Sequence, residues 1–241
     1  KHLKLLSLQK LVLDVKCGKA AFMKTREDAK LLAQSMVQTG TDLGIEVTAQ
    51  ITEMDNPIGV MFGNSHEIVE CIDCLNGKGP EDTMELIYAQ ADALGYDIRE
   101  VIQNGSAMNE FKQLCSRQGV SDNDITSLST EPWSVLPKEK HSTDIASQKS
   151  GFISEIDALK IGEVLCKLGA GRTGENSDIN HGIGAELIKS RGDYIDEGEA
   201  WIRFDTSHAM DSETVTMIQS ALVTSQQEVK TASRIIEVIT S

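Results

Sequence analysis

The sequence has no long apolar run, no cluster of basic residues and no paired set of cysteines. A membrane-spanning helix needs about 20 predominantly apolar residues in a row, and no segment of the chain approaches that length. The first residues also lack the apolar core and the small-residue cleavage site of a secretory signal. These absences predict a soluble, cytoplasmic protein that has no membrane partner.

Positive charge is scarce. The chain has 23 Lys and Arg against 37 Asp and Glu, which gives a formal net charge of -14. A chain of this charge repels nucleic acid backbones unless a local basic patch offsets it, and the sequence has no such patch, so we exclude nucleic acid as a partner. With 241 residues, 40% of them hydrophobic, the chain can bury a sizeable core in one or two domains.

The five cysteines are odd in number and scattered along the chain, which argues against a disulfide framework. Cys71 and Cys74 form a CxxC motif inside a predicted helix that would place Ile68, Cys71, Ile72 and Leu75 on one face. A structural zinc ion needs four ligands, and the sequence offers neither a second CxxC nor a nearby pair of histidines. We therefore interpret these two cysteines as buried thiols.

The first half of the chain predicts an α/β arrangement. Residues 10–16 form a short apolar run typical of a buried strand, a helix begins at Thr25, and residues 44–52 form the next strand. A strand, a helix and a strand joined by short connections predict a parallel pair. Three helical segments then follow, at 65–76, 80–95 and 98–119.

The second half has a different pattern. Residues 121–147 carry two prolines and many small polar residues without a sustained period, which is typical of a linker. A helix through Leu159 and Leu168 then precedes short strands, a helix at 211–226 and a strand at 234–240. We thus predict the α/β class, with an α/β domain portion at 1–120, the linker, and a smaller α+β module at 148–241.

Two motifs suggest functions that their context does not support. Residues 169–174 read GxGxxG, but they follow a predicted helix, whereas the dinucleotide fingerprint follows a strand and opens a helix. We interpret these glycines as a helix C-cap and a loop. His66 has no evident partner in the sequence, and an isolated histidine is more often structural or exposed than catalytic.

Four long segments, taken together and in order, resemble the thymidine phosphorylase and pyrimidine nucleoside phosphorylase family. They are "LVLDVKCGKAAFMKTREDAKLLAQSMVQTG", "ITEMDNPIGVMFGNSHEIVECIDCLNGKGPED", "GFISEIDALKIGEVLCKLGAGR" and "DINHGIGAELIKSRGDYIDEGEAWI". The resemblance implies a large α/β domain with a further C-terminal module, and a homodimer when full-length. It also implies that the family's N-terminal helical domain is largely absent from this chain, which begins with Lys.

The resemblance implies a pentosyl transfer, the reversible phosphorolysis of thymidine or deoxyuridine to the base and 2-deoxyribose 1-phosphate. Inorganic phosphate is the co-substrate, and no organic cofactor is expected. The family lysine that contacts the pyrimidine matches Lys1, or His2 in an ungapped alignment. Phe22 matches a position that lines the base pocket, and its alternative interpretation is an ordinary core residue after a strand.

Some relatives bind a monovalent cation, and the resemblance implies a possible potassium site made by the carbonyls of Ile58 and Met61 and by Glu70. The alternative is a glutamate on a helix face without an ion. The family's glycine-rich phosphate segment precedes the first residue here, so we expect no activity from this chain alone. Three alternatives stay open: a broader enzyme that accepts uridine, a shortened non-catalytic binding protein, and a phosphoribosyltransferase.

Overall fold

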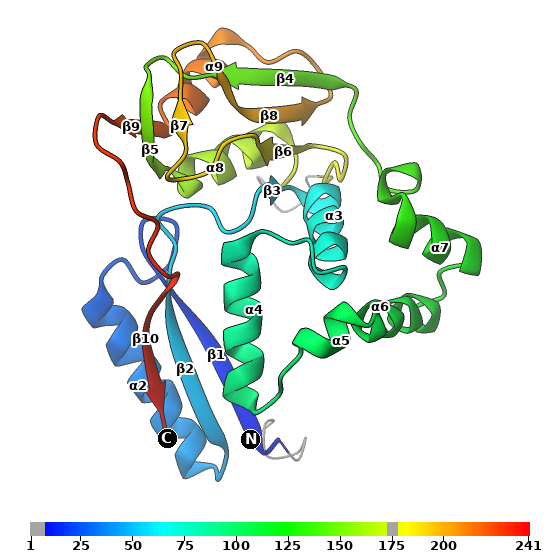
Figure 1. The fold of residues 1–241 in the computed structure, drawn as a ribbon, viewed down its shortest axis with the longest axis vertical. Helices are drawn as coiled ribbons and strands as arrows, with labels where there is room; N and C mark the ends of the chain where they lie inside the picture. Colours follow the sequence, from blue (N-terminus) through cyan, green and yellow to red (C-terminus); the bar gives the residue numbers. More distant parts are fainter. Residues whose placement is uncertain (1–7, 173–177) are drawn as a thin grey trace.

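The computed structural model describes residues 8–172 and 178–241, which form a mixed α/β fold with three small sheets. The strands are β1 (Lys10–Cys17), β2 (Glu46–Glu53), β3 (Met61–Phe62), β4 (His141–Ala146), β5 (Gly151–Ile156), β6 (Gly184–Leu187), β7 (Tyr194–Ile195), β8 (Ala200–Thr206), β9 (Leu222–Ser225) and β10 (Ile235–Thr240). The helices are α2 (Arg26–Asp42), α3 (Asn64–Leu75), α4 (Glu81–Leu94), α5 (Arg99–Gln103), α6 (Ser106–Arg117), α7 (Asp122–Thr130), η1 (Pro132–Ser134), α8 (Ala158–Leu168) and α9 (Ser212–Gln219). Figure 1 shows the sheet of β1, β2 and β10 at the end of the molecule where the C-terminus lies, and the other two sheets at the opposite end.

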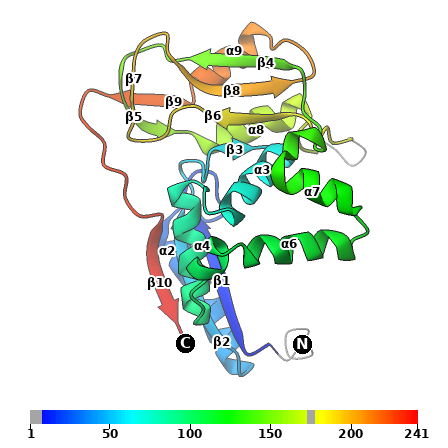
Figure 2. The same ribbon diagram turned by 45° about the vertical axis from the view of Figure 1, so that its right-hand side comes forward.

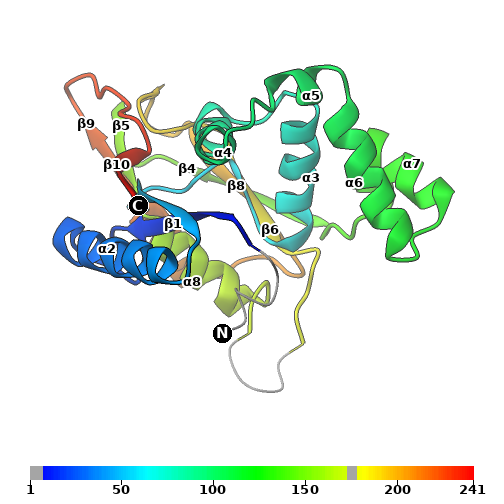
Figure 3. The ribbon, with the colours of Figure 1, turned by 90° about the horizontal axis from the view of Figure 1, so that it is seen from below.

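The first sheet has the order β1-β2-β10. The predicted parallel pair is confirmed, with Val12 opposite Thr48 along an unbroken register. Alternate residues of β2, among them Val47 and Ala49, pack into the core that helix α2 covers. Gln50 points to the other face, where its side chain donates to the carbonyl of Ala89 in α4 at 2.9 Å. The two helices therefore cover opposite faces of the sheet, as Figure 3 shows from below.

Helix α2 begins where its capping residue predicts. The Thr25 hydroxyl accepts a hydrogen bond from the amide of Asp28 at 3.1 Å, and Glu27 and Asp28 place negative charge in the first turn. This arrangement satisfies one of the free amides at the helix start and favours the helix dipole. The helix then buries Ala29 and Ala33 against the sheet, which allows the close approach of its backbone to β2.

The last predicted strand exists, but its expected partner is wrong. Residues 235–240 form β10, which does not complete the C-terminal module but pairs antiparallel with β2, with Ile239 opposite Ala49. The apolar pattern of a strand indicates that it will pair, without indicating with which strand. Because β1 occupies one edge of β2, the other edge is open for β10.

The expected linker at 121–147 is also wrong at the level of secondary structure. It contains α7 and η1 and ends in β4, which pairs antiparallel with β8 in the sheet of order β3-β6-β8-β4. Ser121 caps α7 by accepting a hydrogen bond from the Asp124 amide at 3.2 Å. Some of the small polar residues that suggest a loop are thus helix-capping residues. The same residue types favour both loops and helix caps, so composition alone does not distinguish the two.

The second and third sheets of the molecule, which consist mainly of residues from 148–225, form the core of the C-terminal module. Trp201, Ile202 and Phe204 of β8 are fully buried in it, and helices α8 and α9 supply further apolar residues. The final helix is shorter than the predicted 211–226, because the chain leaves α9 after Gln219 and forms β9, which pairs with β5.

The helical block between the two ends agrees with the prediction for α3 and α4. The predicted third helix is split into α5 and α6 at Gly105, which has a φ of 80°. Figures 1 and 2 both show α6 and α7 projecting away from the sheets. The predicted face of α3 is correct for Ile72, which is buried, and wrong for Ile68 and Cys71, which are exposed. Cys74 is buried, and the buried face also includes His66 and Glu70. A hydrogen bond between His66 and Asp205 and the bond from the Met61 amide to Glu70 partly compensate the burial of these two polar side chains.

Candidate functional site

The loops that follow β1 and β2 lie side by side. Both strands run in the same direction, and their last residues, Cys17 and Glu53, are paired. Loop 18–25 and loop 54–60 therefore both leave the sheet at the carboxyl ends of its parallel strands, which is where open α/β sheets bind ligands. Backbone hydrogen bonds join the loops, from Met54 to Cys17 at 2.8 Å and from Ala20 to Met54 at 3.1 Å.

Loop 18–25 requires glycine at its first position. Gly18 has a φ of 139°, and a Cβ atom there would lie 2.7 Å from the Asp55 Oδ1 atom. The same Asp55 oxygen accepts the amide hydrogen of Lys19 at 2.7 Å. The Lys19 ammonium in turn contacts Glu155 of β5 at 2.5 Å. The loop is thus held between loop 54–60 and the C-terminal module.

Phe22 is the most exposed large apolar residue of this region, with 99% of its surface accessible. Its neighbour Ala21 is buried and anchors the loop. The interpretation of Phe22 as an ordinary core residue is therefore wrong. The exposed ring presents an aromatic face at the carboxyl ends of the parallel strands, a position from which it can stack on a planar ligand.

Glu70 of α3 reaches back to the end of loop 54–60. Its Oε2 atom accepts hydrogen bonds from the amides of Val60 at 2.6 Å and Met61 at 2.9 Å. Burial raises the pKa of the Glu70 carboxyl group, and the two amide bonds only partly offset this effect. Gly59 lies against the same carboxylate, since a Cβ atom there would be 2.0 Å from Oε1.

These contacts bring the residues predicted for a cation site into one neighbourhood. Met61 is bound to Glu70 through its amide, and Ile58 lies in the loop that packs on the same side chain. A carboxylate and backbone carbonyls are the donors that hard cations prefer, so these residue types fit a monovalent ion. Among residues 8–172 and 178–241, no group of three or more His, Cys, Asp and Glu is arranged to hold a metal ion by side chains.

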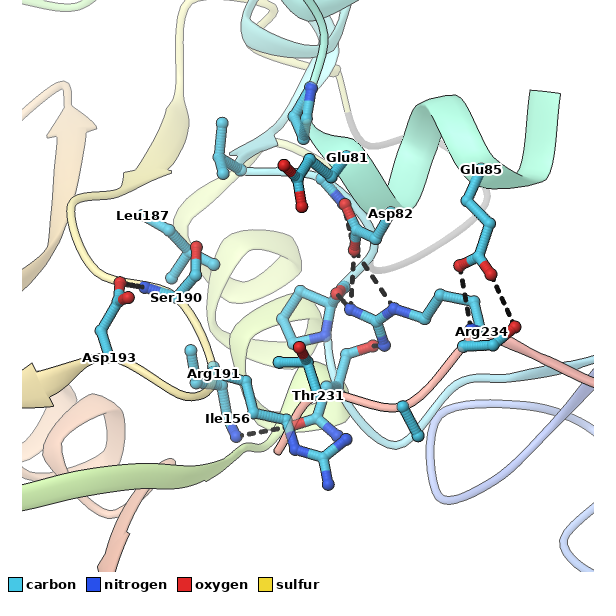
Figure 4. Close-up of a pocket in the computed structure, with 17 residues that line it drawn as sticks. Glu81, Asp82, Glu85, Ile156, Leu187, Ser190, Arg191, Asp193, Thr231 and Arg234 are labelled. Carbon is cyan, nitrogen blue, oxygen red and sulfur yellow. Dashed lines mark hydrogen bonds and ion pairs between the residues drawn. The ribbon is translucent and has the colours of Figure 1, made fainter. Parts of the chain in front are cut away.

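A cleft of about 690 Å³ borders loop 54–60 on the side of the C-terminal module. Its other walls are the first turn of α4, the turn at 187–193 and the segment 231–234 that leads into β10. In Figure 4 the side chains of Asp82 and Arg234 point toward each other inside this cleft. The guanidinium Nη2 of Arg234 contacts Asp82 at 2.8 Å.

Three residues of this cleft, Asn56, Asp82 and Arg234, were not predicted from the sequence. Asn56 is 4% exposed, and Arg234 joins three separate segments. A polar residue directly after a buried strand is a signal that could have drawn attention to Asn56. No local signal indicates Arg234, because its partners Glu53 and Asp82 precede it by 181 and 152 positions.

His66 has a partner that its sequence context did not indicate. The residue is 1% exposed, its Nε2 atom lies 2.9 Å from Asp205 Oδ2, and its ring packs edge-on against Trp133. Its Nδ1 atom is buried without a hydrogen-bond partner among the described residues. Because its contacts are the buried Asp205 and the ring of Trp133, we interpret His66 as structural, which is one of the two possibilities from the sequence.

Two further expectations can be placed. Gly169 ends α8 with a φ of 110° in the left-handed region, which confirms the C-cap interpretation of the GxGxxG motif. Lys1 and its alternative His2, proposed to contact the base, lie outside the described residues.

Comparison with known proteins agrees with the resemblance seen in the sequence. The family description "Pyrimidine nucleoside phosphorylase C-terminal domain" matches residues 152–224. The chain is 38% identical over 202 residues to pyrimidine-nucleoside phosphorylase of Bacillus subtilis (strain 168), covering 78% of this chain and 46% of that protein. It is 33% identical over 228 residues to the pyrimidine-nucleoside phosphorylase of Staphylococcus aureus (strain USA300), covering 88% of this chain and 51% of that protein.

These matches cover most of this chain, and the chain spans about half the length of these curated relatives. No helix among the described residues is long and apolar enough to cross a membrane. The sequence and these comparisons agree: most of the chain is similar to pyrimidine-nucleoside phosphorylases, and residues 152–224 match the C-terminal domain of that family.

Proposed function

We propose that this chain is the C-terminal part of a thymidine phosphorylase. The enzyme transfers the 2-deoxyribosyl group of thymidine or deoxyuridine to inorganic phosphate, and the reaction is reversible. The observation that carries the proposal is the similarity over most of the chain to proteins named pyrimidine-nucleoside phosphorylase. The exposed ring of Phe22 at the carboxyl ends of β1 and β2 supports it.

The chemistry defines what the site must supply. Cleavage of the glycosidic bond develops positive charge on the sugar and negative charge on the departing base, so a donor beside the base carbonyls favours the transition state. In this proposal Lys1 is that donor, and Phe22 stacks on the pyrimidine. The base would then lie over loop 18–25, which Gly18 and Asp55 fix to the end of the sheet.

The proposal includes a potassium ion beside loop 54–60, held by the carbonyl oxygens of Ile58 and Met61 and by Glu70. Two observations support it. Glu70 already contacts the amide of Met61, and burial together with the charges of Asp82 and Glu67 raises the pKa of its carboxyl group. A bound cation would offset that concentration of negative charge.

Comparison of thermal stability in KCl and in choline chloride at equal ionic strength tests the ion. We expect potassium to raise the midpoint temperature of unfolding of the wild-type protein, because a ligand stabilises the folded state that binds it. The midpoint temperature of Glu70→Gln should be the same in both salts. An equal midpoint in both salts would reject the ion, and Glu70 would then act only as an acceptor for the amides of Val60 and Met61.

The remaining partners follow from the same proposal. They are a pyrimidine nucleoside, inorganic phosphate and a second copy of the full-length protein in the cytoplasm, with no organic cofactor. Because the chain spans about half of its relatives, we infer that it lacks the phosphate-binding segment and has no phosphorolytic activity alone. Appreciable phosphate-dependent turnover by the pure 241-residue chain would contradict this inference.

The function is tested by thymine release from thymidine in the longer protein that contains this chain, with uridine measured alongside. We expect release to require phosphate and to fall strongly in Lys1→Ala. Comparable rates with uridine would favour the broader pyrimidine nucleoside phosphorylase. No release from a folded longer protein would reject catalysis and favour the non-catalytic binding protein, whose resemblance to the family would then be one of fold alone.

A further inference from the structure

Arg234 lies at the point where the segment from the C-terminal module enters β10, and only 12% of its side chain is exposed. Its guanidinium group contacts the carboxylates of Glu53, at the end of β2, and of Asp82, in the first turn of α4. It also donates to the backbone carbonyls of Asn56, at 3.3 Å, and Pro57. A single side chain thus joins β2, α4 and loop 54–60, and Figure 4 shows its contact with Asp82.

The two carboxylates that contact Arg234 hold the same loop from their other sides. Glu53 Oε1 accepts the amide hydrogens of Asp55 and Asn56, each at 3.0 Å. The Asp82 carboxylate accepts the amide hydrogen of Gly59 at 3.3 Å. Every described side-chain contact of Arg234 therefore either touches loop 54–60 or neutralises a carboxylate that binds it. Its backbone amide donates instead to Glu85 at 3.1 Å, and its backbone carbonyl accepts the amide hydrogen of Glu53 at 2.8 Å.

The charge balance of this network depends on the guanidinium group. Burial alone would raise the pKa of the Glu53 carboxyl group, but the bonds from Asn56 and the charge of Arg234 lower it below its usual value. Without Arg234, two partly buried carboxylates would share the neighbourhood without a cation, which is unfavourable. The planar fork of arginine also allows several simultaneous bonds that lysine cannot reproduce.

We propose that Arg234 is a positioning residue of the candidate site. It acts through Glu53 and Asp82 to fix the conformation of loop 54–60, and so places Ile58 and Gly59 beside Glu70. This inference rests on the proposed function, because that function makes the loop part of the nucleoside site. If Arg234 served only to hold β10 on the sheet, a substitution there would instead accelerate amide exchange throughout the sheet.

Amide hydrogen exchange on this chain distinguishes the two roles. The variants are Arg234→Met, which removes the charge and the fork, and Arg234→Lys, which keeps the charge. Arg203→Met is the matched control. Arg203 also binds a carboxylate through two hydrogen bonds, to Asp144 at 2.7 and 3.1 Å, but this pair lies on the exposed side of β8. Urea denaturation of each variant measures global stability in parallel.

We expect the amides of Asn56 and Gly59 to exchange at least about tenfold faster in Arg234→Met, the factor that follows from losing one bond to a charged group. Amides in the middle of β2 should exchange faster only by the factor that the loss of global unfolding free energy accounts for. Arg203→Met should leave the exchange rates of the loop amides at their wild-type values. Arg234→Lys should give an intermediate rate. Wild-type exchange in the loop, or equal acceleration throughout β2, would overturn the proposal.

If Arg234→Met does not fold, Arg234→Lys carries the same test, and wild-type loop exchange in that variant would overturn the proposal. In the longer protein, Arg234→Met should lower kcat/KM for thymidine by at least about tenfold, with partial recovery in Arg234→Lys. Failure of the function is distinguishable: a wild-type longer protein without phosphorolysis rejects the nucleoside site, while the exchange result still decides whether Arg234 fixes the loop.

Discussion

The side-chain oxygen of Asn56 accepts the amide hydrogen of Ile156 at 2.9 Å, and this bond joins the end of the first sheet to the last residue of β5. The side-chain nitrogen of the same asparagine donates to Glu53 Oε1, also at 2.9 Å. Asn56 is thus a buried polar residue whose donor and acceptor groups are both used. Through these two hydrogen bonds it connects the candidate site to the C-terminal module.

We expect Asn56→Ala to lower the free energy of unfolding by about 2 kcal/mol, because the Ile156 amide would remain buried without its acceptor. Urea denaturation measures this change. The matched control is Asn109→Ala on the exposed side of α6, which should change the free energy of unfolding by no more than about 0.5 kcal/mol. Equal effects of the two substitutions would show that the bond to Ile156 contributes nothing to stability.

Substitution of two glycines by alanine should change the free energy of unfolding in opposite directions. Gly184 in β6 is buried, and a Cβ atom there would lie 2.1 Å from the Nδ1 atom of His66. Gly184→Ala should therefore lower the free energy of unfolding by about 2 kcal/mol or more. Gly162 lies in the exposed part of α8 with nothing within 4 Å of its added Cβ, so Gly162→Ala should raise it by about 1 kcal/mol. Thermal or urea denaturation of both variants checks the signs.

Asp205 should make stability depend on acid pH. Burial alone would raise the pKa of its carboxyl group, but hydrogen bonds from Ser142, His66 and Lys138 outweigh burial and lower the pKa below 3.8. Because the folded pKa lies below the unfolded one, the ionised carboxylate stabilises the fold above the unfolded pKa, and this stabilisation is lost as pH falls through the folded pKa.

Urea denaturation of the wild type and of Asp205→Asn across pH measures this effect. The difference in unfolding free energy should stay constant from pH 7 to about 5 and should shrink below about pH 4. Asp196→Asn, at an exposed turn, serves as the control. A difference that grows on acidification would contradict the assigned direction of the pKa shift.

Phe22 should affect binding and leave stability unchanged. Its ring is 99% exposed, so Phe22→Ala should change the free energy of unfolding by less than about 0.5 kcal/mol. If the ring stacks on the pyrimidine, the same substitution in the longer protein should raise KM for thymidine by about tenfold or more. A stability loss without a change in KM would indicate that Phe22 packs against another part of that longer protein and does not contact the nucleoside.

The sequence predicts local elements well where one signal determines them. Thr25 indicates the start of α2, and the apolar run at 10–16 identifies β1, because capping and burial are local or periodic properties. It fails where a partner must be chosen. The alternation in β10 identifies a strand, yet nothing in residues 235–240 distinguishes β2 from the strands of the nearer module.

The candidate site divides in the same way. The resemblance to the family predicts that Ile58, Met61 and Glu70 hold one cation, and this stays a prediction. The structure shows that Glu70 accepts the amide hydrogen of Met61. Arg234 could not be predicted, because its role depends on carboxylates that the chain brings back from more than 150 positions away. Spacing rules apply within one helix or hairpin, and this network joins three elements.

Because β10 pairs with β2 near the other end of the chain, the first sheet cannot be completed until nearly all of these residues have been synthesised. Closing so long a loop costs conformational entropy before the paired strands compensate it, which slows folding. The C-terminal module, whose strands pair over shorter separations, can fold before that closure. We therefore expect loop 54–60, which Arg234 holds at the start of β10, to become ordered only after the C-terminal module has folded.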